Sequence, residues 1–262
     1  MQQAEEKRYA LDEVRPLIDW LYFDHAWQMG QAKDLAGDGK ATYDQLRSDA
    51  EKMLDDWHGR YFTHSLFLLM EAGSDVDDIV LCEEDRQVRL PMLRQQQTAL
   101  PGVPSLCLAD YLPPVSGKQK GIIGLFAVTV DREMEEPMPG DPYQTMLRQT
   151  LADRLAEATA EKLHKEKMEG GIRPAVGYPS MPDMSMNFVL DELLGFRRIG
   201  IRLTENGMMI PHGSVSGLIL THPQARYFHL GKIDEVQLAD YAARRNLPLE
   251  TVRKYLRAVL KQ

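Results

Sequence analysis

Long hydrophobic runs and cysteines are the plainest absences from this 262-residue sequence. No stretch of about 18 apolar residues occurs, and residues 1–8 are polar, so we expect neither a membrane span nor a secretion signal. We therefore expect a cytoplasmic protein. The two cysteines, Cys82 and Cys107, lack the spacing of a metal site and lie in apolar, strand-like contexts. That setting favours buried thiols over a disulfide.

Positive charge is also scarce. Lysine and arginine total 31, against 39 aspartate and glutamate residues, which gives a formal net charge of −8. Because binding to phosphate groups requires a basic face, this balance argues against nonspecific contact with nucleic acid or with an acidic membrane. The 7 histidines are scattered, and no Walker loop, glycine-rich Rossmann fingerprint or HExxH helix occurs. We expect no protein-bound metal.

The composition is that of an ordinary globular protein, with 44% hydrophobic residues and enough length for one large domain or two small ones. The pattern predicts a helical part over residues 1–62 and a sheet with helices over residues 63–262. Helical spacing of apolar residues occurs over 11–27 and 43–61. Short apolar runs separated by turns, such as residues 73–75 and 213–217, predict a sheet built from hairpins. The expected strands are residues 63–70, 79–82, 103–108, 122–130, 198–203, 218–221 and 225–230.

Residues 143–168 carry the clearest helical pattern, with further helices expected at 185–194, 233–245 and 248–260. Asp153 and Glu157 lie one turn apart on one side of the first of these helices. Acids at this spacing usually form a solvated, salt-bridged face, but they can also line a cleft if the following chain folds back over the helix. Asp19, beside Trp20, has the same two interpretations.

Residues 171–182 have the character of a binding loop. Three prolines restrict the backbone, so Arg173 and Tyr178 are held in set directions with little entropy left to lose on binding. An arginine fork suits a carboxylate or phosphate, a tyrosine ring can cover an apolar or cationic ligand, and Gly177 lets the backbone approach a ligand closely. The alternative is a proline-rich crossover in which Arg173 pairs with a structural acid.

The motif in residues 171–178 resembles the Arg-x-x-x-Gly-Tyr motif of the reactivation domain of cobalamin-dependent methionine synthase. Further similarity extends in order along nearly the whole chain. The matching stretches are residues 18–20, 93–96, 107–111, 126–129, 152–158, 214–217, 222–223, 227–228 and 237–244.

The resemblance implies a single C-shaped α+β domain over residues 1–262, with a twisted antiparallel sheet and flanking helices instead of a Rossmann core. Such a domain binds S-adenosylmethionine in a shallow groove. It supports reductive methylation of inactive cob(II)alamin, with an electron from flavodoxin or a similar donor and a methyl group from S-adenosylmethionine. The partner implied is the cobalamin-binding module of methionine synthase.

Site residues follow from the same resemblance. Arg173 would hold the ligand carboxylate, and Asp19 and Glu157 the amino group or the sulfonium side. Tyr178 and Tyr227 would face the adenosyl body and the corrin, and Asp153 would receive the histidine that cobalt releases. A second acid for that histidine would lie in residues 131–136. The predicted ligand site also includes Pro174, Ala175, Gly177 and Phe228.

Two departures from the family are evident. The family usually has Pro-Glu-His-x-Glu-Lys after the motif, whereas this sequence has Pro-Asp-Met-Ser-Met-Asn at residues 182–187, which puts partner contacts there in question. The sequence also contains no homocysteine, folate or cobalamin module, so we expect it to act on a separate cobalamin protein. Two alternatives stay open: an S-adenosylmethionine sensor or adaptor without methyl transfer, and a reactivation module for another corrinoid methyltransferase.

Overall fold

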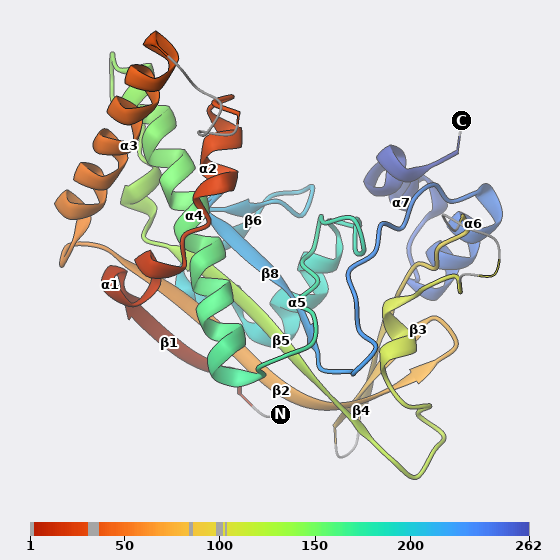
Figure 1. Ribbon diagram of the computed structural model, residues 1–262. Coiled ribbons are helices and arrows are strands. Elements are labelled where there is room, and N and C mark those ends of the chain that lie inside the picture. Colours follow the sequence, from red (N-terminus) through yellow and green to blue (C-terminus); the bar gives the residue numbers. More distant parts are fainter. Residues whose placement is uncertain (1–2, 31–36, 84–85, 98–101, 103, 262) are drawn as a thin grey trace.

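The centre of the fold is a twisted sheet of six strands, in which every described pairing is antiparallel (Figure 1). The computed structural model describes residues 3–30, 37–83, 86–97, 102 and 104–261. The strand order is β4, β3, β2, β5, β8, and β1 also pairs with β2. The strands are β1 (Glu5–Ala10), β2 (Phe62–Asp75), β3 (Asp78–Glu83), β4 (Arg86–Pro91), β5 (Gly121–Val130) and β8 (Ser214–Leu220). Strands β6 (Arg202–Leu203) and β7 (Met209–Ile210) form a separate pair.

Alternate residues of the central strands face two hydrophobic cores. Leu66 and Leu125 belong to one core, whereas their neighbours Phe67 and Phe126 belong to the other. Helix α5 (Met186–Leu194) contributes to the first core and helix α4 (Pro142–Lys167) to the second. Because successive strand residues point to opposite faces, the two helices cover opposite faces of the sheet.

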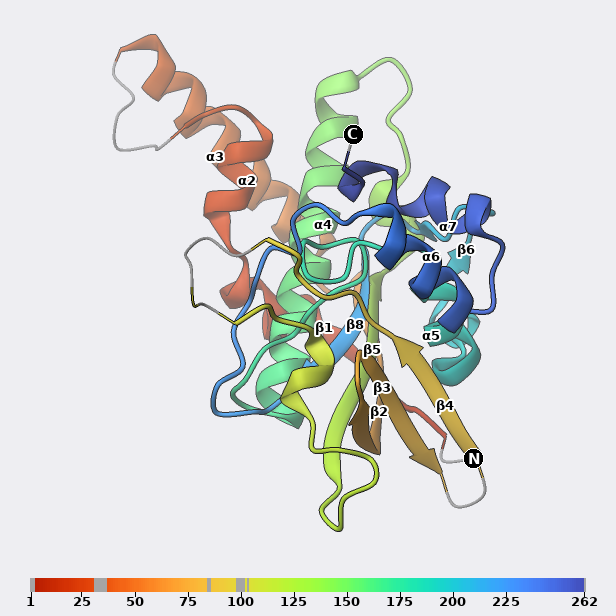
Figure 2. The same cartoon turned by 90° about the vertical axis from the view of Figure 1, so that its right-hand side faces the viewer.

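The remaining helices form two groups. Helices α1 (Leu11–Val14), α2 (Trp20–Ala26) and α3 (Asp38–Trp57) pack on the α4 side, and α6 (Glu235–Arg244) and α7 (Leu249–Leu256) enclose a small core of their own. Figures 1 and 2 show the first group and the α6–α7 pair on opposite sides of the molecule, so that with the sheet they give the predicted C-shaped outline. The predicted class, a single α+β domain with an antiparallel sheet, is confirmed.

The prediction that residues 1–62 are helical is wrong at Glu5–Ala10, which forms β1. This segment is charged, and in it only Tyr9 is a large buried side chain. Charged side chains are typical of strands at a sheet edge, and the apolar pattern that marks a central strand is therefore missing. Residues 73–75 and 213–217 were predicted as turns, but residues 73–75 lie within β2 and residues 214–217 lie within β8.

Three predicted strands are wrong in whole or in part. Residues 198–203 form a strand only at Arg202–Leu203, because a 3-10 helix covers Phe196–Ile199. Residues 104–107 have no regular structure and are followed by a 3-10 helix at Leu108–Tyr111, while Val103 lies outside the described residues. Residues 225–230 have no strand partner. Their aromatic side chains line a cavity, as described below, so their apolar character reflects a binding wall and not a sheet. Among the described helices, none has both the length and the apolar character required to span a membrane.

Candidate functional site

Residues 171–182, hereafter the ligand segment, run beside the outer edge of β8. The Ile172 N–H donates to the Leu220 carbonyl and the Leu220 N–H donates back, both at 2.9 Å. The Leu218 N–H donates to the Pro174 carbonyl at 3.0 Å, and the Val176 N–H to the Ser216 carbonyl at 2.9 Å. These bonds fix the direction of the segment and cover an edge that would otherwise be unpaired.

Two glycines permit this close approach. Gly171 has φ of +75°, and a Cβ atom there would overlap the Leu220 carbonyl oxygen. On β8, a Cβ atom on Gly217 would overlap the Pro174 carbonyl oxygen and lie 2.8 Å from the Ala175 Cα atom. Only a residue without a side chain fits at either position.

The ligand segment forms one wall of a cavity of about 460 Å³, hereafter the Arg173 cavity. Helix α2 contributes Tyr22, α4 contributes Glu157, and the chain after β8 supplies a third wall. The lining residues are Tyr22, Glu157, Arg173, Pro174, Ala175, Tyr178, Pro179, Ser180, Tyr227, Phe228 and His229. A cavity of this size, with apolar walls and a few polar groups, suits a small organic ligand.

Arg173 is the cation of this cavity. Its side chain is 12% exposed, and its Nη2 atom lies 3.5 Å from Oε2 of Glu157. The guanidinium carbon lies 5.5 Å from the centre of the Phe126 ring, and the buried Nε atom has no hydrogen-bond partner among the described residues. The guanidinium is therefore held in place while part of its donor capacity is unused.

Glu157 is held between two side chains, because the Tyr178 hydroxyl donates to its Oε1 atom while Arg173 lies beside Oε2. Burial, and next the negative charge of Glu157, raise the pKa of Tyr178 well above its usual value. The phenol therefore stays a neutral donor. The predicted folding back of the segment over α4 thus occurs, and the alternative pairing of Arg173 with an acid occurs with it.

Tyr227 and Phe228, from the chain after β8, form another wall of the cavity. The Tyr227 ring is 64% exposed, and its hydroxyl accepts the backbone N–H of Arg173 at 2.9 Å. The backbone N–H of Leu230 donates to the Pro179 carbonyl at 3.0 Å. These two bonds tie the wall to both ends of the ligand segment.

Two of the residues predicted to bind the ligand are not among those that line the cavity. Asp19 is exposed and caps α2, where its side chain accepts the Leu21 N–H at 3.0 Å. Gly177 has φ of +85°, and its N–H donates to the Met181 carbonyl at 2.9 Å, so it shapes the turn of the segment.

The sequence analysis missed four lining residues. The omitted residues are Tyr22, Pro179, Ser180 and His229. Pro179 and Ser180 directly follow Tyr178 in the ligand segment, and His229 follows the predicted Tyr227 and Phe228, so adjacency was an available signal for these three. For Tyr22, the only signal in the sequence was its position three residues after the predicted site residue Asp19.

Asp153 lies outside the Arg173 cavity, on the same helix as Glu157. Its pKa is raised to about 6, first because the surrounding protein displaces water and then because the carboxylates of Glu135 and Glu157 are close, against the opposing charges of Arg154 and His212. Glu135 lies in the 131–136 loop and accepts the backbone N–H groups of His212, at 2.8 Å, and of Gly213. It is the acid of that loop whose charge reaches Asp153.

Replacing Asp153 by Asn should stabilise the protein more above pH 6 than near pH 4. The pKa of about 6 exceeds the ordinary value of 3.8, so the folded state holds the proton more tightly, and ionisation lowers stability as pH rises through this window. The protein packs around the Asp153 carboxylate, but the residue as a whole is exposed, so solvent screens the effect and we expect a gain under about 1 kcal/mol. Urea unfolding of the original protein and of Asp153→Asn at about pH 4 and about pH 7 measures the gain in stability. An equal gain at both pH values would contradict the raised pKa of Asp153.

Four of the altered residues 182–187 are buried, and Pro182 and Met184 are partly exposed. Asp183 is 2% exposed and Asn187 is fully buried. Asp183 accepts the Tyr241 hydroxyl at 2.7 Å and an Arg245 N–H at 3.1 Å, and the Asn187 amide donates to the Gly207 carbonyl at 2.8 Å. These side chains join α5 and α6 to the body of the domain, so they are not presented to a partner.

Asp183→Asn should lower the free energy of unfolding by about 3 kcal/mol or more, because it leaves the buried Arg245 guanidinium without its counter-charge. The matched control is Asp240→Asn, which breaks an exposed pair with Arg244 and should cost less than about 1 kcal/mol. Urea unfolding measures both variants. A similar small loss in the two would show that the buried pair is not needed to hold α6.

Comparison with known proteins identifies the family and the fold. The family model described as "Vitamin B12 dependent methionine synthase, activation domain" matches residues 10–169 and 165–246. The crystal structure of the MetH reactivation domain bound to AdoHcy is similar to this structure with a TM-score of 0.86 and 30% sequence identity, over 99% of this chain and 90% of that chain. The chain therefore belongs to the activation-domain family of vitamin B12-dependent methionine synthase.

Proposed function

We propose that this domain binds S-adenosylmethionine in the Arg173 cavity and offers its methyl group to a cobalamin-binding module whose cobalt has decayed to Co(II). The observation that carries the proposal is the pairing of a guanidinium, with unused donors, and a carboxylate inside one small cavity with tyrosine walls. A zwitterionic amino acid with an aromatic body needs these groups. The AdoHcy-bound relative supports the same class of ligand.

The residues have distinct proposed roles. Arg173 would hold the ligand carboxylate, and Glu157 would face the amino group or the sulfonium. Tyr178 and Tyr227 would cover the adenosyl body on its two sides, with Pro174, Ala175 and Phe228 completing the apolar walls. Asp19 would reach the amino group from the first turn of α2, whose Tyr22 already lines the cavity.

The chemistry requires positioning more than acid–base catalysis. The corrinoid of the partner module, once reduced by one electron from flavodoxin or a similar donor, would supply the nucleophile. S-adenosylmethionine would supply the methyl group, and S-adenosylhomocysteine would be the product that leaves. The residues of this chain bind and orient the sulfonium and exclude water from it. Asp153, with Glu135 beside it, would stabilise the displaced histidine of the module as an imidazolium.

The test has two stages. Calorimetry should show binding of S-adenosylmethionine and S-adenosylhomocysteine to the isolated domain. The domain is then mixed with S-adenosylmethionine, a chemical reductant and a separately prepared cobalamin module of methionine synthase in the Co(II) state. We expect methylcobalamin to form, and its absorbance measures the reaction. Binding without methylation would favour the sensor or adaptor. Methylation only of another corrinoid protein would favour a reactivation module for another corrinoid methyltransferase, and no binding would overturn the proposal.

A further inference from the structure

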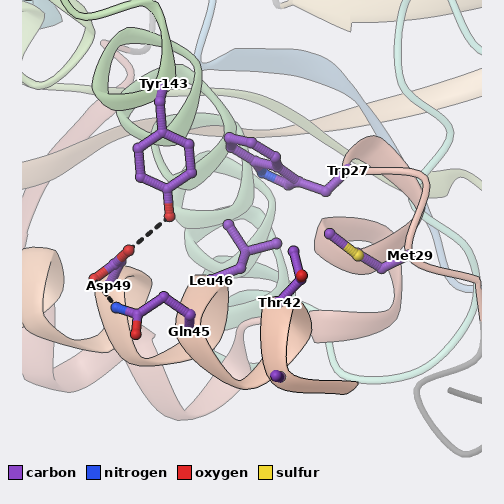
Figure 3. Close-up of a pocket in the computed structure, with 8 residues that line it drawn as sticks. Trp27, Met29, Thr42, Gln45, Leu46, Asp49 and Tyr143 are labelled. Carbon is purple, nitrogen blue, oxygen red and sulfur yellow. Dashed lines mark hydrogen bonds between the residues drawn. The ribbon is translucent and has the colours of Figure 1, made fainter. Parts of the chain in front are cut away.

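A second cavity, larger than the first, lies between the end of α2, the start of α3 and the start of α4 (Figure 3). Its volume is about 710 Å³, and it shares no lining residue with the Arg173 cavity. We call it the Asp49 groove. It is lined by Trp27, Met29, Ala41, Thr42, Gln45, Leu46, Asp49 and Tyr143.

Most of the lining is apolar and much of it is aromatic. The rings of Trp27 and Tyr143 pack edge to face, with 5.4 Å between their centres. Leu46 and Met29 lie on either side of the space below these rings in Figure 3. Aromatic rings attract cations through their negative faces, and a flexible methionine adapts to varied apolar groups.

One carboxylate supplies the charge of this groove. The Asp49 Oδ2 atom accepts the Tyr143 hydroxyl at 2.7 Å, and Oδ1 accepts the Gln45 amide at 2.9 Å, as the dashed lines of Figure 3 show. Both donors are neutral, since burial and the Asp49 charge raise the pKa of Tyr143 to about 12. Within the described ranges Asp49 forms no ion pair, whereas Glu51 and Asp55 on the same helix both pair with Arg15.

These observations favour a ligand of one chemical class. A neutral apolar molecule would bring no counter-charge to the carboxylate, and an anion would be repelled by it. A cation with an apolar body would place its charge between the carboxylate and the rings and its body on Leu46 and Met29. We propose that the Asp49 groove binds a small organic ammonium ion, at a site independent of the S-adenosylmethionine cavity.

Choline and its uncharged isostere 3,3-dimethylbutan-1-ol provide the probes, because they differ in charge and hardly in shape. The readout is the indole N–H signal of Trp27 in two-dimensional NMR, assigned with Trp27→Phe. We expect choline to shift this signal in a saturable way below about 50 mM, and the alcohol to bind at least about tenfold more weakly.

Asp49→Asn should weaken choline binding at least about tenfold and leave the alcohol unchanged. The matched control Asp56→Asn removes an exposed acid from the same helix, outside the groove, and should alter neither affinity. Circular dichroism confirms that each variant is folded. Equal affinity for the two probes, no shift at Trp27, or normal choline binding by Asp49→Asn would each overturn the proposal.

Discussion

Arg173→Ala should weaken S-adenosylmethionine binding by about 2 to 4 kcal/mol, roughly 30- to 1,000-fold. The guanidinium is only 12% exposed, so a carboxylate bound there would be largely desolvated and would have no water to replace the lost donors. Removal of the side chain also leaves Glu157 facing the ligand carboxylate as a like charge at close range. Calorimetry of the two proteins measures the loss.

Arg173→Lys is the matched control for this result. It keeps the charge but loses the fork and the buried Nε donor, so an intermediate loss of affinity is expected if bidentate geometry matters.

Glu157→Gln then locates the acid relative to the ligand. It should weaken S-adenosylmethionine more than the neutral thioether S-adenosylhomocysteine if Glu157 is near sulfur, and both equally if it is near the amino group. An Arg173→Ala affinity within about threefold of the original would place the carboxylate elsewhere.

The helices and the central strand were predictable because their signals are local. The 3.6-residue period of residues 143–168 and the continuous apolar run of residues 122–130 each correspond to one observed element, α4 and β5. The helix predicted at residues 185–194 corresponds to α5, and Gly195, which directly follows it, adopts the left-handed conformation with φ of +74°.

The rest depended on contacts that a sequence pattern does not contain. β1 is a strand because β2 offers it an edge, and its own charged residues give no alternation that would reveal this. The site shows the same limit. Asp153 and Glu157 share one side of α4, yet only Glu157 lines the Arg173 cavity, because the ligand segment crosses the helix at that turn. Helical spacing predicts a shared side but not where another segment crosses it.

Gly217→Ala should abolish most S-adenosylmethionine binding even though position 217 is not among the lining residues of the cavity. The new methyl group would overlap the Pro174 carbonyl oxygen and approach the Ala175 Cα atom to 2.8 Å, and both obstacles are backbone. Backbone cannot rotate away as a side chain can, so either the ligand segment moves off β8 or the strand shifts. Either movement displaces Arg173, which is adjacent to Pro174.

The expected loss of affinity is at least about tenfold, because small displacements of a positioned binding group remove its directional contacts, and the stability cost is about 1 to 3 kcal/mol. Gly124→Ala on the neighbouring strand is the matched control. Its methyl group would also be crowded, at 2.6 Å from Met168 Sδ and 2.9 Å from the Phe67 ring, but these atoms belong to side chains and not to the backbone of the ligand segment. Calorimetry at a temperature where both variants are folded separates the loss of S-adenosylmethionine affinity from the loss of stability. If Gly217→Ala binds S-adenosylmethionine as well as Gly124→Ala does, the closeness of the ligand segment to β8 is not what positions Arg173.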